Sequence, residues 1–282
     1  METRELRYFV AVAEELHFGR AAQRLGMAQP PLSRAISQLE RRLGAVLLLR
    51  DSRSVTLTPA GEVLLHESRV ALDAVEAAEQ RTRRAARSPD DAPSIVLATK
   101  AGASSELLAK LLHAYGIEPG SVRVQIELCA PGEQVQLLRT GRADVAILHR
   151  PFDDVSGFDV EELLTEGQVA VLPTAHALSA RTGLSMSELT ELSDLPLPRW
   201  PGSDGAYPDG PGPEVQSHSQ LLQLISLGRT LMLAPDSCRS QLHDDLVAVP
   251  VVDAPGVTTV IAWPPGSRSQ AVADLVRVAL RL

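Results

Sequence analysis

The chain has 282 residues, two cysteines and a formal net charge of -8, and these numbers exclude several protein classes. The length suits two or three domains. Cys129 and Cys238 lie far apart without CxxC or zinc-ligand spacing, which argues against a disulfide scaffold or metal finger and suits a reducing compartment. The first residues are too charged for a signal peptide, and no apolar run approaches the roughly 20 residues of a membrane span. We therefore expect a cytoplasmic protein without membrane contact, metal or cofactor.

The charge is unevenly distributed along the chain. Residues 1–58 contain nine arginines and six acidic residues, a net charge of +3, whereas residues 59–282 carry -11. A mildly basic segment ahead of an acidic body suggests that only the first part meets phosphate groups.

Apolar spacing in the basic segment predicts three short helices, over residues 4–16, 18–25 and 29–43. The third begins at Gln29-Pro30-Pro31, because amides of a first turn need no acceptor inside the helix. Its inward stripe is expected to contain Leu32, Ile36, Leu39 and Leu43. A polar turn over residues 50–54 and a short strand over 55–57 then predict the wing of a winged helix.

A long helix follows, predicted over residues 59–87, with Thr58 as its cap and Pro59 at its first position. At about 1.5 Å per residue it spans on the order of 45 Å. Small residues along one seam would let a second helix approach closely, which predicts a dimerisation helix. The seam contains Val63, Val70, Ala74 and Ala77. The alternative is a helix that packs on its own chain, and residues 88–93 form a linker in either case.

Strands and helices alternate in the remainder, which predicts an α/β region with mostly parallel strands. The expected strands are 95–99, 122–129, 143–149, 168–172, 195–198, 230–233 and 257–263. The expected helices are 105–115, 133–140, 185–192, 219–227 and 269–280. The breaker-rich segment 201–213 is predicted to be a surface loop.

Three stretches carry a resemblance to a known family: LRYFVAVAE from Leu6, HFGRAAQRLGMAQPPLSRAISQLERRLG from His17, and LLLRDSRSVTLTPAG from Leu47. They resemble the winged helix-turn-helix of LysR-type transcriptional regulators, in family order and at family spacing. The sequence of residues 28–34 is similar to that of the family branch that controls the catabolism of aromatic compounds. Gly19 departs from the family pattern, standing where many members carry a Ser or Thr helix cap. Leu48 and Leu49 replace the more usual Phe and polar residue.

The resemblance implies a winged helix-turn-helix over residues 1–58, a dimerisation and linker helix over 59–91, and an effector domain over 92–282. That domain would be a periplasmic-binding-protein-like α/β fold with two lobes. The first lobe would hold about 92–164 and 265–282, and the second about 165–264. The implied function is DNA-binding transcription regulation that a small-molecule effector modulates.

A helix that enters the major groove needs short polar side chains and donors that match base edges. Arg34 can pair with guanine and Gln29 with adenine, each contributing roughly 1–3 kcal/mol of discrimination. Further contacts, to phosphate or the minor groove, are expected from Ser33, Gln38, Arg50 and Arg53. Pro30 is also expected at the DNA-binding surface. The alternative is that these side chains only solvate a helix, and Arg50 can instead pair with Asp51 or a helix end. One such module makes few contacts, so we expect a homodimer on a pseudo-palindromic site, and the resemblance implies a homotetramer.

Ligands of such α/β lobes bind beyond the carboxyl ends of the strands. The first lobe then offers Thr99, Lys100, Gly102, Ser104, Cys129 and Arg150, and the second offers Ser217, His218 and Ser219. Backbone amides at a helix N-terminus suit a carboxylate, so the expected effector is a small organic anion held by Ser104, Ser217 and Lys100. The alternative is that these are loop residues without a ligand, and Cys129 can be simple packing.

Other functional classes have less support. The sequence contains no GxSxG, P-loop, GxGxxG or HExxH motif, and its seven histidines show no ligand spacing. An enzyme is therefore not expected, since an α/β body alone does not imply catalysis. An architectural DNA binder that senses no ligand stays open as an alternative. A periplasmic binding protein is opposed by the missing export signal and by the helix-turn-helix.

Overall fold

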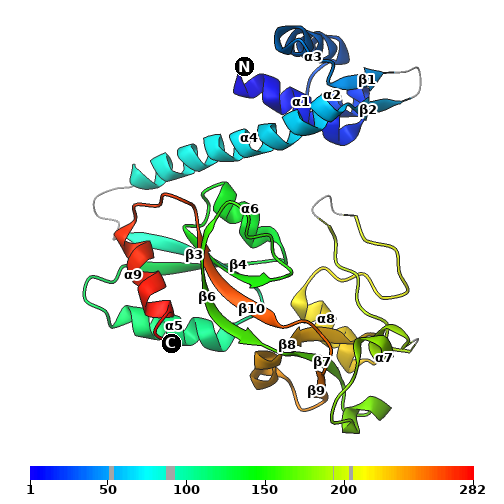
Figure 1. Cartoon of the computed structure of the whole chain (residues 1–282), viewed down its shortest axis with the longest axis vertical. Helices are drawn as coiled ribbons and strands as arrows, with labels where there is room; N and C mark the ends of the chain where they lie inside the picture. Colours follow the sequence, from blue (N-terminus) through cyan, green and yellow to red (C-terminus); the bar gives the residue numbers. More distant parts are fainter. Residues whose placement is uncertain (51–53, 87–92, 193, 203–205) are drawn as a thin grey trace. The chain divides into compact units, whose positions relative to one another are not determined.

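The computed structural model describes residues 1–50, 54–86, 93–192, 194–202 and 206–282. The chain divides into two compact units, Met1–Arg87 with Arg139–Gly141, and Ser88–Leu138 with Arg142–Leu282 (Figure 1).

The first unit is a helical domain with one β-hairpin. Its elements are α1 (Thr3–Glu15), α2 (Phe18–Arg24), α3 (Gln29–Leu43), β1 (Leu48–Arg50), β2 (Val55–Leu57) and α4 (Pro59–Ala85). The four predicted helices and the strand at 55–57 are confirmed, whereas the pairing strand β1 was not predicted. The strands pair antiparallel, with Leu48 opposite Leu57. Predicted wing residue Arg53 lies outside the described residues.

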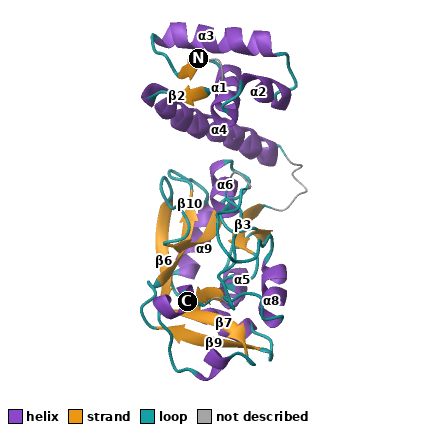
Figure 2. Cartoon of the chain, turned by 90° about the vertical axis from the view of Figure 1, so that its right-hand side faces the viewer, coloured by secondary structure: helices purple, strands orange, loops and turns teal. Residues whose placement is uncertain are grey.

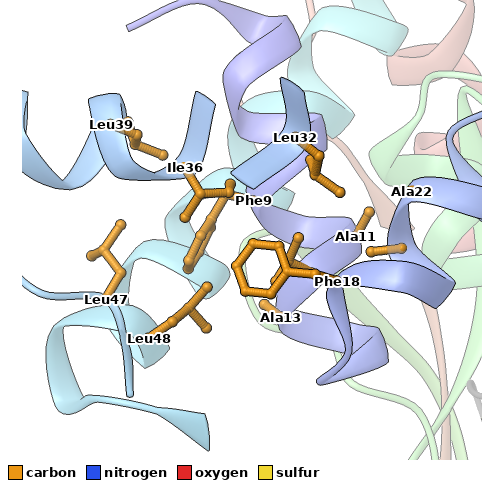
Figure 3. Packing of buried hydrophobic residues seen from close by; sticks show 12 residues of the cluster. Phe9, Ala11, Ala13, Phe18, Ala22, Leu32, Ile36, Leu39, Leu47 and Leu48 are labelled. Atoms are coloured by element: carbon orange, nitrogen blue, oxygen red, sulfur yellow. The ribbon is translucent and has the colours of Figure 1, made fainter. Parts of the chain in front are cut away.

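Apolar side chains from α1, α2, α3 and β1 make one core (Figure 3). Phe9, Leu32 and Leu39 are fully buried in it. The inward position predicted for Leu43 is wrong, because Leu43 is 44% exposed. It occupies the last residue of α3, past the point where the helix covers the core.

The start of α4 is fixed by the cap that the sequence predicted. The Thr58 hydroxyl accepts a hydrogen bond from the Gly61 amide at 3.0 Å and donates one to the Val46 carbonyl at 2.7 Å. Leu64 and Leu65 pack against the core of this unit. Val63 and Val70, on the predicted seam, are 64% and 54% exposed. Ala77, also predicted on the seam, is only 4% exposed. The helix thus packs on its own chain along one face and at Ala77, and leaves only part of the predicted seam open.

The second unit contains two sheets (Figure 2). The first has the order β4-β3-β5-β10-β6 and the second the order β8-β7-β9. Its strands are β3 (Ser94–Lys100), β4 (Arg123–Cys129), β5 (Val145–Arg150), β6 (Asp159–Glu166), β7 (Gln168–Pro173), β8 (Met232–Pro235), β9 (Leu246–Val251) and β10 (Val257–Trp263).

Helices cover both faces of each sheet. They are α5 (Ser105–Gly116), α6 (Glu133–Arg139), α7 (Met186–Thr190), α8 (His218–Ser226) and α9 (Gln270–Ala279), with short 3-10 helices η1 (Ala177–Ala180) and η2 (Asp236–Gln241). Helices α5 and α9 pack on one face of the five-stranded sheet and α6 on the other. Helix α8 packs on one face of the three-stranded sheet, and Leu189 of α7 belongs to the core on the other face.

The prediction of mostly parallel strands is wrong. Among the described strands, only β3 pairs in parallel, with β4 and β5, while β10 and both pairings of β7 are antiparallel. The predicted lobe boundary is also wrong at one strand. The prediction placed β10 in the second lobe, but β10 lies between β5 and β6 of the first sheet. The chain therefore leaves the first lobe after β6 and returns with β10.

Three details of the strand prediction were also wrong. The segment 195–198 forms no strand, and only an isolated bridge joins Arg199 to Glu214. Strands β6 and β9 were missed, and both are edge strands. Three glutamates in β6 and the exposed Pro250 in β9 hide the alternating pattern, and both residue types are tolerated at a sheet edge.

Within the ranges described, no helix is both long and apolar enough to cross a membrane.

Candidate functional site

Helix α3 presents one continuous polar face. Its opposite stripe is buried, which turns Gln29, Pro30, Arg34 and Gln38 toward solvent and leaves Ser33 half-buried. These are the five α3 residues predicted to meet DNA, and helical spacing brings them onto neighbouring turns of one face. Within the described part of the chain, Arg34 has no ion-pair partner, so its guanidinium remains available for an external acceptor.

Arg50, by contrast, is held by the protein. Its guanidinium lies 3.1 Å from a Glu40 carboxylate oxygen, 3.5 Å from the Ser33 hydroxyl and 4.6 Å from the centre of the Phe18 ring. Because Arg50 is paired within the protein, its contact with DNA remains a prediction that the geometry does not support. The partner of Arg50 is Glu40 of α3 and not a helix end. This ion pair joins residues ten positions apart, so it has no local sequence signal.

Glu40 itself connects α3 to the hairpin. One carboxylate oxygen accepts hydrogen bonds from the Leu47 and Leu48 amides at 3.0 and 3.2 Å, and the other binds Arg50. The Glu40 side chain is 17% exposed, so these contacts are partly shielded from water. They fix the position of β1 relative to α3.

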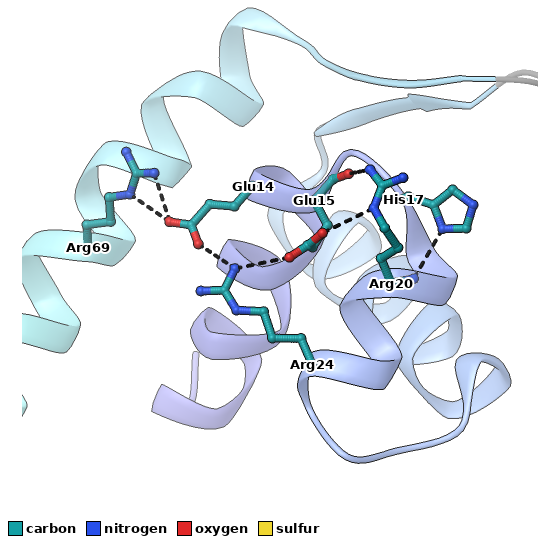
Figure 4. Close-up of polar contacts among 6 residues, drawn as sticks. All are labelled: Glu14, Glu15, His17, Arg20, Arg24 and Arg69. Carbon is teal, nitrogen blue, oxygen red and sulfur yellow. Dashed lines mark hydrogen bonds and ion pairs between the residues drawn. The ribbon is translucent and has the colours of Figure 1, made fainter. Parts of the chain in front are cut away.

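A second polar cluster joins α1 to α2 and α4 (Figure 4). Glu14 pairs with Arg69 at 2.8 Å and with Arg24 at 2.9 Å, and Glu15 pairs with Arg20 at 3.2 Å. Burial alone would raise the pKa of Glu14, but hydrogen bonds from Arg69 and Arg24 bring that pKa below its usual value. Three of the unit's arginines thus hold helices together through their side chains.

The cap of α2 corrects the expectation about Gly19. His17 is the N-cap, and its ring Nδ1 accepts hydrogen bonds from the Gly19 and Arg20 amides, both at 3.1 Å. A Cβ at position 19 would lie 2.9 Å from the His17 ring. Glycine at this position therefore makes room for the capping ring, and the helix start is not left uncapped.

The pair Glu5–Arg42 predicts an acid-sensitive contact between α1 and α3. Two hydrogen bonds, at 2.9 and 2.6 Å, join the groups, and those from Arg42 are the main cause that lowers the pKa of Glu5 to about 2. Stability from a depressed carboxyl pKa is present above the unfolded value near 4.5 and is lost as pH falls toward 2. Glu5→Gln is thus expected to lower the urea midpoint of the helical circular dichroism at pH 7, and to lower it less at pH 3. An equal loss at both pH values would contradict this linkage.

In the second unit, a cleft of about 670 Å³ is lined by residues from both sheets. Six predicted effector residues lie on its wall: Lys100, Gly102, Ser104, Cys129, Ser217 and His218. The two lobes touch beside it, where the Ser105 hydroxyl donates to the Gln241 side chain at 3.2 Å. Gly102 is required there, because its φ is +79° and a Cβ would lie 2.4 Å from the His218 ring.

Three predicted effector residues do not line the cleft. Thr99 is fully buried, because strand alternation directs it with Ile95 and Leu97 to the sheet face that α5 and α9 cover. Arg150 pairs with Glu162 on the neighbouring part of the sheet. Ser219 is exposed, on a turn of α8 that is not part of the wall.

Lys100 is not a free cation. Its ammonium lies 3.0 Å from Asp153, and the two side chains are 15% and 3% exposed. The expectation that Lys100 directly holds an anionic effector is therefore unsupported. Asp153 was missed by the sequence analysis, since only the fold brings the loop after β5 beside the end of β3.

The remaining wall is largely apolar. It includes Phe152 from the first lobe, with Trp200, Leu221, Met232 and Leu242 from the second. Trp200 follows Arg199, whose guanidinium donates to the Gly212 and Pro208 carbonyls at 2.7 and 3.0 Å and pairs with Glu214. The loop predicted at 201–213 is thus fastened to the chain beside the cleft wall. An apolar wall of this kind suits a ligand with a hydrocarbon body.

Both cysteines line the cleft, and both thiols are protonated at neutral pH. Burial raises the pKa of Cys129 to about 12 and that of Cys238 to about 11. Because only the thiolate is nucleophilic, iodoacetamide at pH 8 is expected to label both at least about 100-fold more slowly in the folded chain than in urea. Mass spectrometry of quenched time points measures the two rates. Fast labelling of either folded thiol would contradict its raised pKa.

Comparison with known proteins identifies the family of the chain. Residues 3–62 match the family model described as bacterial regulatory helix-turn-helix protein, lysR family, and residues 90–282 match the LysR substrate binding domain. The chain belongs to the LysR family. This LysR-type chain is a DNA-binding transcription regulator with an effector-binding domain, and its named relatives are regulators and not enzymes.

Two curated relatives and one solved structure illustrate the similarity. The chain is 30% identical to the regulator AlsR of Bacillus subtilis over 87% of its own length and 84% of that protein. It is 32% identical to CatR of Pseudomonas putida, over 93% and 92% of the two chains. The crystal structure of full-length BenM shares 27% identity and a TM-score of 0.51, over 100% of this chain and 96% of that one.

Proposed function

We propose that this LysR-type regulator reads promoter DNA with the exposed face of α3 and changes its binding when a small organic anion occupies the cleft. The observation that carries the first part is the polar face of α3, where Gln29, Arg34 and Gln38 are exposed and Ser33 is half-buried, on a helix whose other side is buried. Arg34 would pair with a guanine edge and Gln29 with an adenine edge. Among the predicted wing contacts, Arg50 would serve to hold the hairpin.

The case for an anion rests on the two helix ends at the cleft. Ser104 precedes α5 and Ser217 caps α8, so the positive ends of both helix dipoles are at the wall. The Ser104 side chain makes no capping hydrogen bond, which leaves first-turn amides of α5 for an external acceptor. A carboxylate on a hydrocarbon body would match these amides and the apolar wall.

Oligomerisation would follow from the apolar residues that α4 leaves exposed. Val63 and Val70 expose apolar surface on a long helix, and a second copy of that helix would cover it. A homodimer would carry two α3 helices to the half-sites of a pseudo-palindrome, and a homotetramer would extend the site.

Fluorescence anisotropy with the intergenic DNA beside the regulator's own gene tests the DNA-binding function. We expect a preference over unrelated DNA of roughly 10³-fold or more, measured at several salt concentrations because phosphate contacts are salt-sensitive. Equal, salt-sensitive binding to both DNAs would favour an architectural role. A screen of organic acids for altered DNA affinity then tests the effector, with Ser104→Ala expected to weaken any response.

A further inference from the structure

A buried polar chain connects the cleft to the interior of the first lobe. The Ser104 hydroxyl lies 2.9 Å from His149 Nε2, and His149 Nδ1 lies 3.7 Å from Asp153 Oδ2. The same Asp153 oxygen accepts the His149 backbone amide at 2.7 Å and contacts the Lys100 ammonium at 3.0 Å. The side chains of His149 and Asp153 are only 4% and 3% exposed.

The charge on Asp153 decides where a neutral His149 ring carries its proton. Burial alone would raise the pKa of Asp153, but His149 and Lys100 bring it below its usual value, so the carboxyl is ionised. His149 Nδ1 has no hydrogen-bond partner among the described residues. The Asp153 carboxylate would repel an unprotonated Nδ1 lone pair and attracts an Nδ1–H, so the proton of the neutral ring is favoured on Nδ1. Nε2 is then bare, and the Ser104 hydroxyl must donate to it.

This arrangement determines what Ser104 offers to a ligand. With a neutral ring, the Ser104 proton points to His149 and only oxygen lone pairs face the cleft, which repels an anion. With a second proton on the ring, Nε2–H donates to Ser104, whose own proton is released toward the cleft. The Lys100–Asp153 pair has no net charge, so the added proton also supplies the positive charge that balances a carboxylate.

We propose that His149 is a positioning residue that couples anion binding at Ser104 to the uptake of one proton from solvent at His149 Nε2. The inference rests on the proposed effector function of the cleft. It adds that, while the His149 ring is neutral, the cleft suits an uncharged ligand that donates a hydrogen bond to Ser104. Other titratable groups on the wall are Glu133, Cys129, Cys238 and His218. The thiols are neutral at the raised pKa values given above, and burial lowers the pKa of His218.

The state of the ring can be tested without any ligand. Full-length chain labelled with ¹⁵N-histidine is titrated by NMR, with His149 assigned by its loss in His149→Gln or by the shift that Ser104→Ala causes. We expect the neutral ring to be the Nδ1–H tautomer. Observation of the Nε2–H tautomer would overturn the proposal, because Ser104 would then accept from the ring at every pH.

The linkage is tested with cyclohexanecarboxylate, an apolar ring with one charge, and its neutral amide, using Trp200 fluorescence. Carboxylate affinity is expected to fall with rising pH, by up to about tenfold per pH unit where binding takes up one whole proton, and amide affinity is expected not to fall. In His149→Gln the side-chain amide takes up no proton in this pH range, so the slope should vanish. His113→Gln, a histidine on α5 outside the cleft wall, should keep it.

A wild-type carboxylate affinity that does not change with pH would overturn the linkage alone. Absence of binding by both probes, with the Nδ1–H tautomer present, would instead count against the proposed effector site, and the linkage would fall with it. The two failures are therefore distinguishable.

Discussion

Replacement of Arg34 by alanine is expected to lower affinity for the cognate site by roughly 10- to 100-fold, which corresponds to about 1–3 kcal/mol for one bidentate contact to a guanine edge. Binding to unrelated DNA should change far less, because an edge contact exists only at the right base. The physical basis is the exposed guanidinium on the polar face of α3. Anisotropy titrations with cognate and unrelated duplexes measure both affinities.

A matched control removes the same charge elsewhere. Arg229 is exposed and lies after α8 in the second unit, so Arg229→Ala should leave both affinities unchanged. If Arg34→Ala weakens cognate and unrelated DNA equally and reduces the salt slope by about one, the side chain contacts phosphate and does not read sequence.

Replacement of Glu40 by alanine is expected to destabilise the first unit by at least about 2 kcal/mol, because the Leu47 and Leu48 amides lose their acceptor and each unpaired buried amide costs about 1–3 kcal/mol. Arg50 also loses its ion pair, which frees the hairpin. Both tryptophans, Trp200 and Trp263, lie in the second unit. Urea unfolding should therefore shift when followed by helical circular dichroism and stay unchanged when followed by tryptophan fluorescence.

Glu40→Gln separates the two roles of this side chain. Its amide oxygen still accepts from the backbone amides, while the charge that pairs with Arg50 is gone. We expect a smaller loss of stability than for Glu40→Ala, with weakened DNA binding if the hairpin position matters. Equal stability losses in both variants would show that the charge, and not the acceptor, holds β1 in place.

The sequence alone was sufficient for the helices of the first unit. Periodicity at Leu32, Ile36 and Leu39 placed the buried stripe of α3, and therefore its exposed polar face, because a helix fixes both sides at once. Thr58 and Pro59 located the start of α4 for an equally local reason, since cap chemistry depends on residues three apart. The Glu40–Arg50 pair could not be predicted this way, because it depends on how the hairpin returns to α3.

In the second unit the sequence determined less. It placed Ser104 and Ser217 at helix starts beside the cleft, since strand-to-helix junctions have local signals. The tertiary structure alone decided that β10 returns to the first sheet, and that Asp153 neutralises Lys100 and lies beside His149. Strand order and contacts between distant segments depend on how buried surfaces pair, and a local pattern of residues carries no record of that pairing.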